Sequence, residues 1–246
     1  MRNYKINYLI LLLFFQINIL FSQKNFSGKV EYTVKPSESF NPMKISKDQK
    51  KRAKLIPFFM ESAHFILNFT QKESLYKKKS LGIKIDNKKG KSHSSFSGIF
   101  GGGDGIYYSE SNDKTTILQK NSFGDLFLVS HHFPKWELSQ ETKKIGKYKC
   151  FKAIRINKSY EKNNSNSKKT IVWYTPEIPV PFGPTLYNGL PGLVMEVKIG
   201  KIIFSVTKIT LNSKKKIFIT LPKKGIKISE EKYYRKLREF GKSIGF

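Results

Sequence analysis

The 246-residue sequence predicts a mainly β (α+β) protein, a single strongly curved antiparallel sheet or half-barrel with one helix in the N-terminal half and one at the C-terminus. Two observations predict this class. About ten short apolar runs alternate with polar residues or are separated by turn residues, as in the strands of a meander. Two other segments instead carry apolar residues at the three- and four-residue spacing of a helix that packs on a sheet.

The first 22 residues have the form of a secretory signal peptide. Two basic residues precede an apolar core, and Ser22 is a small residue suited to the position before cleavage. The core contains Gln16 and Asn18 and is shorter than the run of about 20 apolar residues that spans a membrane. We therefore expect export to the periplasm or outer-membrane periphery, a single domain over residues 23–246, and no transmembrane segment after cleavage. An uncleaved membrane anchor is the competing interpretation.

The N-terminal half predicts strands with a helix between the first two. Apolar residues alternate with polar ones around residues 30–34 and again around 65–69, which is typical of half-buried strands. Ser46-Lys47-Asp48-Gln49 has the form of a helix-capping box, so a helix is expected from Ser46 to about Ile56, before Pro57.

The rest of the chain predicts a meander that ends in a helix. The further strands are expected at residues 75–76, 81–85, 106–108, 115–119, 125–130, 136–139, 147–157, 170–175, 193–199, 202–211 and 217–221. Gly200-Lys201 lies between two apolar runs and predicts a tight hairpin. Residues 229–242 predict an amphipathic helix, because Tyr233, Leu237 and Phe240 recur on one face.

The chain is strongly basic, with 46 Lys and Arg against 18 Asp and Glu and a formal net charge of +28. Such a charge attracts DNA, anionic lipid or acidic polysaccharide. The basic residues are nearly all Lys, however, and Arg is the better residue for bidentate phosphate recognition. Two explanations of the positive charge stay open: amino-acid usage typical of an AT-rich genome, and a functional anionic partner. No specific nucleic-acid partner is expected.

Chemistry-bearing residues are few, and they do not form a recognisable site. Cys150 is the single cysteine, so the fold has no internal disulfide; a buried packing thiol is the preferred interpretation, with an intermolecular bridge left open. His131 and His132 are adjacent and would point to opposite faces of a strand. We therefore expect no catalytic residues, no cofactor and no metal.

The most specific motif is the run Gly189-Leu190-Pro191-Gly192-Leu193. Pro followed by Gly predicts a type II turn, in which Gly192 would adopt a positive φ. The turn leads into a strand rich in β-branched residues. The motif holds no group that performs chemistry.

Several ordered blocks resemble the GLPGLI family, a group of uncharacterised envelope proteins of Gram-negative bacteria. Val194 follows the motif where the family pattern has Ile. The resemblance is carried by Trp136, by residues 146–153 and by the segment from Trp173 to Leu193. Within that segment the motif residues, which we expect to form a structural turn and strand, are Trp173, Pro176, Pro179, Gly183, Pro184, Gly189, Leu190, Pro191, Gly192 and Leu193. The order of elements also resembles the half-barrels of outer-membrane lipoprotein carriers, an analogy of layout that implies no function.

We therefore predict a non-catalytic binding protein that holds an apolar or peptide ligand, a lipid among the candidates, on the concave face of the curved sheet. The predicted ligand face consists of Tyr32, Val34, Phe65, Leu67 and Phe69. Helices that cover this face as core are one alternative. A second is an accessory or structural subunit that docks onto an envelope transport or secretion assembly through the Pro-rich segment 176–184 and the basic surface. An enzyme of unfamiliar type is the third alternative.

Overall fold

The computed structural model describes residues 26–37, 63–79, 104–156, 169–200, 202–214 and 216–243. Twelve strands form one sheet, and a single helix follows them within this part of the chain. The elements are β1 (Gly28–Pro36), β2 (His64–Phe69), β3 (Glu73–Lys78), β4 (Ile106–Glu110), β5 (Thr115–Ser122), β6 (Asp125–His132), β7 (Glu137–Ile145), β8 (Tyr148–Ile156), β9 (Lys169–Thr175), β10 (Leu193–Ile199), β11 (Ile202–Leu211), β12 (Ile226–Ser229) and α4 (Glu230–Ser243).

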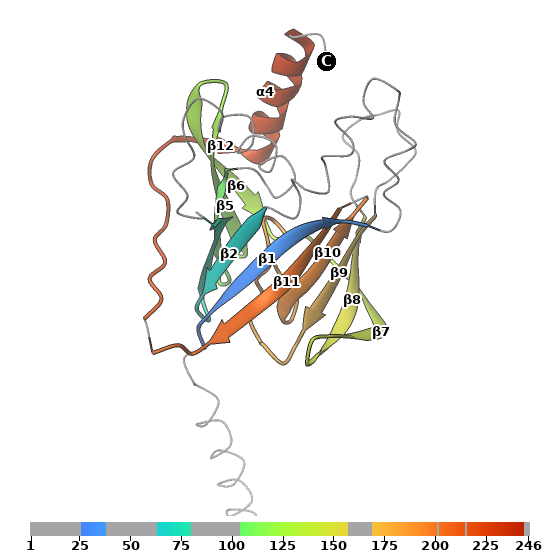
Figure 1. Cartoon of the computed structure of the whole chain (residues 1–246). Helices are drawn as coiled ribbons and strands as arrows, with labels where there is room; N and C mark the ends of the chain where they lie inside the picture. Colours follow the sequence, from blue (N-terminus) through green and yellow to red (C-terminus); the bar gives the residue numbers. More distant parts are fainter. Residues whose placement is uncertain are drawn as a thin grey trace, which may run out of the picture.

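The sheet is open and strongly curved. Its strand order is β12-β6-β5-β4-β3-β2-β1-β11-β10-β9-β8-β7, so β12 and β7 are the two edges. Figure 1 shows β5 and β6 on one side of the molecule and β7 and β8 on the other, with β1 and β11 between them. The hairpin predicted at Gly200-Lys201 is confirmed, because Ile199 pairs with Ile202.

Alternation of apolar and polar residues decides which side chains enter the core. Along β1, Val30, Tyr32 and Val34 are buried while their neighbours are half-buried or exposed, and β2 alternates in the same way. Because successive side chains of a strand point to opposite faces, one face of the central strands forms a continuous apolar core. The opposite, convex face carries mostly charged and polar side chains.

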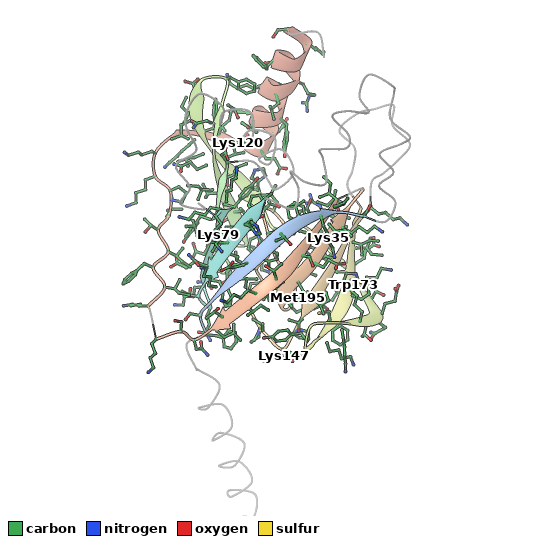
Figure 2. The ribbon with its side chains drawn as sticks, viewed as in Figure 1. Lys35, Lys79, Lys120, Lys147, Trp173 and Met195 are labelled. Atoms are coloured by element: carbon green, nitrogen blue, oxygen red, sulfur yellow. The ribbon has the colours of Figure 1, made fainter. Side chains whose placement is uncertain are left out.

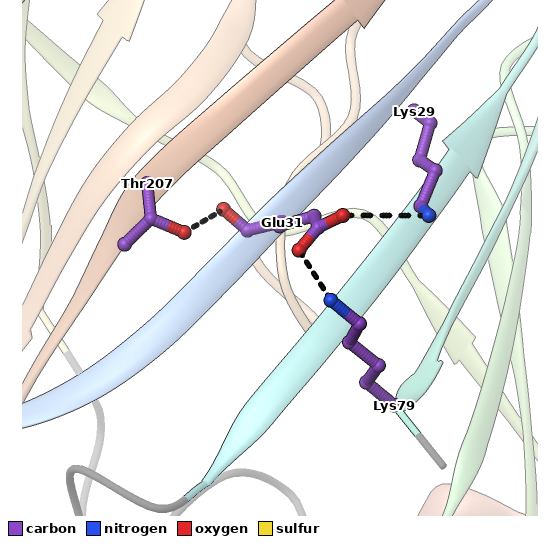
Figure 3. Close-up of polar contacts among 4 residues, drawn as sticks. All are labelled: Lys29, Glu31, Lys79 and Thr207. Carbon is purple, nitrogen blue, oxygen red and sulfur yellow. Dashed lines mark hydrogen bonds and ion pairs between the residues drawn. The ribbon is translucent and has the colours of Figure 1, made fainter. Parts of the chain in front are cut away.

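A bulge in β11 lies opposite β1, where Thr207 is the extra residue that has no partner in the register. The pairing of β1 with β11 shifts between Glu31 and Tyr32, and the hydroxyl of Thr207 donates a hydrogen bond to the Glu31 carbonyl at 3.2 Å. Figure 3 shows the Glu31 carboxylate between two lysines, with Lys79 Nζ at 2.7 Å and Lys29 Nζ at 3.4 Å. The hydrogen bond from Lys79 is the main reason that the pKa of Glu31 is lowered.

The predicted fold class needs correction. The mainly β character holds, but the described part of the chain contains one helix, α4, and not two. The helix expected from Ser46 to about Ile56 lies outside the described residues, as do the signal peptide and the strand expected at 81–85. The sheet is also not wholly antiparallel, because β12 pairs in parallel with β6.

The parallel pair follows from the path of the chain after β11. Residues 212–225 carry the chain from β11 past β1 to β6 to the far edge of the sheet. Seven strand spacings correspond to roughly 34 Å, which 14 extended residues cross easily at roughly 3.3 Å per residue. The strand predicted at 217–221 is therefore wrong: this apolar run is part of the crossing segment, and the strand forms later, at β12.

Candidate functional site

The family-like motif lies in the connection between β9 and β10, residues 176–192, which we call the signature arm. The arm turns back along the start of β10: the Leu193 amide donates to the Ile178 carbonyl at 2.9 Å, and the Val194 amide donates to the Phe182 carbonyl at 3.0 Å. Four apolar side chains of the arm are buried in the same core as the central strands, namely Ile178, Val180, Phe182 and Leu190. The arm thus packs on the concave face of the sheet and fills it.

Two prolines shape the arm through three-residue turns. The Val180 amide donates to the Ile178 carbonyl around Pro179, and the Gly192 amide donates to the Leu190 carbonyl around Pro191, both at 2.8 Å. These are γ-turns, whose central φ near −75° suits proline. The predicted type II turn is therefore wrong, and the positive φ of the motif, 93°, occurs at Gly189 and not at Gly192.

Gly183 and Gly192 are needed for close contact with their surroundings. A Cβ atom on Gly192 would lie 2.2 Å from the carbonyl oxygen of Thr175, and one on Gly183 would lie 2.4 Å from that of Tyr187. Real Cβ atoms do not approach backbone oxygens so closely. Both glycines therefore let the arm press against its own strands, which explains why the motif needs glycine there without any chemistry.

Asn188 joins the arm to the opposite side of the sheet. Its side chain is fully buried; Oδ1 accepts a hydrogen bond from the Gly183 amide at 2.9 Å, and Nδ2 lies 3.1 Å from both the Ser109 and Thr116 hydroxyls. Ser109 belongs to β4 and Thr116 to β5, six or more strands from β9 in the order of the sheet. The sheet therefore curves enough for one amide to bridge its two sides.

Tyr32 adds a second buried contact with the motif strand. Its hydroxyl donates to the Val194 carbonyl at 2.6 Å, where the pairing of β10 with β9 is irregular. Burial raises the pKa of Tyr32, so the phenol stays protonated and keeps donating this bond. This residue thus contributes to holding the start of β10.

The predicted ligand face lies in the packed core. All five of its side chains, Tyr32, Val34, Phe65, Leu67 and Phe69, have an exposed fraction of 0%. They lie with the signature arm in one apolar cluster, so a ligand would reach them only if the arm moved. A ligand at this face stays a prediction.

A pocket of about 870 Å³ opens beside the arm. Its walls come from three places: the β4–β5 turn, the β6–β7 connection and the arm itself. The lining residues are Ser111, Asp113, Lys114, His132, Phe133, Pro134, Lys135, Trp136, Leu138, Pro181, Gly189, Leu190 and Pro191. We call this space the motif pocket, because Gly189, Leu190 and Pro191 belong to the motif.

Trp136 is fixed at the pocket wall by the arm. Its indole Nε1 donates to the Asn188 carbonyl at 2.9 Å, and its ring lies 6.4 Å from that of Tyr187. The opposite turn is tied in as well, since the Phe133 amide donates to the Lys114 carbonyl at 2.8 Å. The pocket is therefore preformed by hydrogen bonds and ring packing.

The remaining residues of the resemblance lie on both faces of the sheet. Trp173 faces the convex side, where Lys143 Nζ lies 4.5 Å from its ring centre and 2.7 Å from Glu196 Oε1. Pro184 and Leu193 are buried, whereas Pro176 and Pro179 are exposed. Figure 2 shows Trp173 near the β8 and β9 side of the molecule.

The other reactive side chains lie away from the pocket or are unsuited to chemistry. Cys150 is buried, and burial raises the pKa of its thiol to about 11. His131 is buried beside Glu230, 3.4 Å from Nδ1 to Oε2, and burial lowers the pKa of His131, whereas His132 lies at the pocket. No group of three His, Cys, Asp or Glu that would hold a metal occurs in the described part of the chain.

The sequence placed Trp136 and the motif in the same family-like region, but it gave no sign that Phe133 and Asn188 complete the site. The structure brings Gly189, Leu190 and Pro191 together with Phe133 and Trp136. Asn188 was visible only as the residue before the motif. Its partners Ser109 and Thr116 lie on β4 and β5, and nothing in the sequence links these two residues to Asn188.

Comparison with known proteins finds a match to one uncharacterised family model and a likeness of fold to solved structures. A family model described as "Protein of unknown function (Porph_ging)" matches residues 136–171 and 155–196, the part that contains Trp136, β7 to β9 and the arm. No curated protein matches the chain. The GLPGLI assignment is not confirmed by this match.

Two solved structures share the fold. The structures of PNGF-II in the C2 and P21 space groups superpose with TM-scores of 0.52 and 0.53 at 15% and 17% identity. Each alignment covers 87% of this chain but 33% of PNGF-II, so the chain spans about a third of that protein's length. At such identity the likeness concerns the fold alone.

Proposed function

We propose that this chain is a non-catalytic protein of the cell envelope, of the GLPGLI type, that binds a peptide or other apolar segment in the motif pocket. One observation carries the proposal: the residues of the most specific motif line an open pocket of about 870 Å³. Ligand pockets commonly measure about 300–1,000 Å³ and combine apolar walls with a few polar groups. The motif pocket has this composition.

The lining favours a peptide over a simple acyl chain. Phe133, Trp136 and Leu138 supply apolar and aromatic walls, while Asp113 and Lys114 place both signs of charge at the rim. Charges of both signs suit the termini and side chains of a peptide, and aromatic and proline surfaces suit an extended segment. An acyl chain would use only the apolar part.

Location is part of the proposal. The N-terminal 22 residues support export, with residues 23–246 as the mature protein in the periplasm or at the outer-membrane periphery. No helix in the described part of the chain is both long and apolar enough to cross a membrane.

Native mass spectrometry of residues 23–246, purified gently from a bacterial periplasm, tests the proposal. A bound species that leaves on denaturation is the expected result, and its mass identifies the ligand class. The chain has two tryptophans, so Trp173→Phe leaves Trp136 as the reporter of pocket binding. Titration with a library of short peptides should then change the Trp136 emission saturably.

A pair of variants locates the binding. Leu138 lines the pocket and is 59% exposed, so Leu138→Asp should leave the fold intact and weaken binding by about tenfold or more. Leu221→Asp is the matched control, since Leu221 is also exposed and lies at a different pocket. Equal effects of the two variants, or a bare protein with an unresponsive Trp136, would contradict the proposal.

The second candidate is an accessory subunit that docks on an envelope assembly. The exposed Pro176 and Pro179 favour it, because they present a rigid edge of the arm to solvent. Crosslinking in cells followed by purification should then recover a fixed partner, which Pro176→Ser and Pro179→Ser together would lose while peptide binding in the pocket persists.

A further inference from the structure

The apolar stripe of α4 begins in the core and continues where nothing in the described structure covers it. Tyr233 is buried, its hydroxyl 2.7 Å from the Ser122 Oγ and its ring 5.8 Å from that of Phe127. Leu237 and Phe240 follow at the spacing of one helix face but are 37% and 46% exposed. Figure 1 shows the reason: α4 extends beyond the sheet.

One further aromatic side chain enlarges this surface. Phe123, in the β5–β6 turn, lies 4.8 Å from Phe240 between ring centres and is itself 36% exposed. We call Phe123, Leu237 and Phe240 the helix-tip patch. Large apolar side chains that gather at an exposed tip are characteristic of an interaction surface.

Positive charge surrounds the helix-tip patch. On a helical projection, Lys236 flanks the apolar stripe, and Arg235, Arg238 and Lys242 lie toward the opposite face, all exposed. Within α4, three Lys and two Arg stand against three Glu, and two of these Glu lie in the first turn, away from the patch.

We propose that the tip of α4 binds an anionic lipid surface, with the helix-tip patch inserted between headgroups and the surrounding Lys and Arg against their phosphates. A helix with Phe and Leu on one face and Lys and Arg on the other is suited to the membrane interface. Exposed apolar side chains would gain nothing on a nucleic-acid backbone, which attracts the charge alone. The inference is independent of the motif pocket, which lies at the arm.

Vesicle binding with matched charge variants tests this inference. The protein is residues 23–246, which contains every described residue and lacks the N-terminal apolar run. Vesicles of phosphatidylcholine with 30% phosphatidylglycerol are compared with pure phosphatidylcholine at low and high salt. We expect binding to the anionic vesicles alone, weakened by salt.

Two triple variants separate the helix tip from the total charge. Lys236→Gln, Arg238→Gln and Lys242→Gln together should weaken binding at least tenfold. Replacing the exposed Lys144, Lys147 and Lys149 of the β7–β8 hairpin by Gln removes the same charge and should weaken it less than threefold. Figure 2 places Lys147 at the opposite end of the molecule from α4. Equal losses would show that total charge alone drives binding and would overturn the inference.

A local probe reports insertion. In the Phe240→Trp variant, tryptophan emission should shift to the blue on anionic vesicles, and Leu237→Ser should reduce vesicle binding without changing charge. An unshifted emission would overturn insertion. Concentration-dependent dimerisation that Leu237→Ser abolishes, with no vesicle binding, would assign the patch to a second copy of the chain instead.

Discussion

Replacing Asn188 tests whether the signature arm is fastened to the sheet by a single amide. In Asn188→Ala, the Gly183 amide loses its acceptor, and the Thr185 carbonyl loses a donor at 3.3 Å. The Ser109 and Thr116 hydroxyls remain hydrogen-bonded to each other at 2.9 Å. The loss therefore concerns mainly two buried backbone groups.

The magnitude follows from these two groups. A buried polar group left without a partner costs about 1–3 kcal/mol, and the longer bond to Thr185 belongs at the low end of that range. Adding the small cavity left by the amide, we expect the free energy of unfolding to fall by about 2–4 kcal/mol. The exposed Asn121→Ala should change it by less than about 0.5 kcal/mol.

Urea unfolding, followed by circular dichroism and by Trp136 emission in the Trp173→Phe background, measures both effects. Trp136 donates to the Asn188 backbone carbonyl, so its emission should move to the red before global unfolding if the arm is released. A loss smaller than about 1 kcal/mol, or Trp136 emission that changes only with global unfolding, would refute the idea that Asn188 fastens the arm.

Three further predictions concern single positions. Gly192→Ala should destabilise the fold by more than about 2 kcal/mol, because its Cβ would meet a backbone carbonyl, whereas Gly146→Ala, with open space and φ of 58°, should cost about 1 kcal/mol in the same urea experiment. The pKa of Glu31 is lowered in the folded protein, so ionised Glu31 stabilises the fold above its unfolded pKa, and this stabilisation is lost as the pH falls through the folded pKa. The difference in unfolding free energy between wild type and Lys79→Gln should therefore shrink on acidification. A difference that does not depend on pH would contradict this reasoning. Cys150 should resist a thiol reagent at pH 8 in the native protein and react rapidly in urea, since burial raises its pKa to about 11; fast native labelling would show that the thiol is accessible.

Most strands could be predicted from the sequence because the alternation of apolar and polar residues within a single strand is enough to identify it. Val30, Tyr32 and Val34 alternate with polar neighbours, and this alternation alone identifies the buried face of β1. The run at 217–221 is also apolar and contains β-branched residues, but it lies on the crossing segment, because the chain must pass six strands, β1 to β6, before it pairs with the outer edge of β6. Local β-propensity cannot predict this path, because the path depends on the positions of strands that are distant in the sequence.

The motif shows a second limit of sequence reasoning. The sequence Pro191-Gly192 is compatible with a type II turn, but the structure requires glycine there for another reason. A Cβ atom on Gly192 would lie 2.2 Å from the carbonyl oxygen of Thr175, at the end of β9. The concave face was expected to be open to a ligand or covered by helices. In the structure the arm fills it, with Ile178, Val180 and Phe182 fully buried.

These contacts explain how a motif can be specific without carrying chemistry. Gly183 and Gly192 admit the arm, the γ-turns at Pro179 and Pro191 direct it inward, and Asn188 joins it to the far strands. Each requirement is geometric, and changing any one residue would disturb the positions that the others fix. The same packing places Leu190 and Pro191 beside Trp136 and so creates the motif pocket. The same motif residues therefore serve both the core and the pocket, and most substitutions in the motif would affect folding and binding together. A variant such as Leu138→Asp alters the pocket but not the core, so it can separate binding from folding.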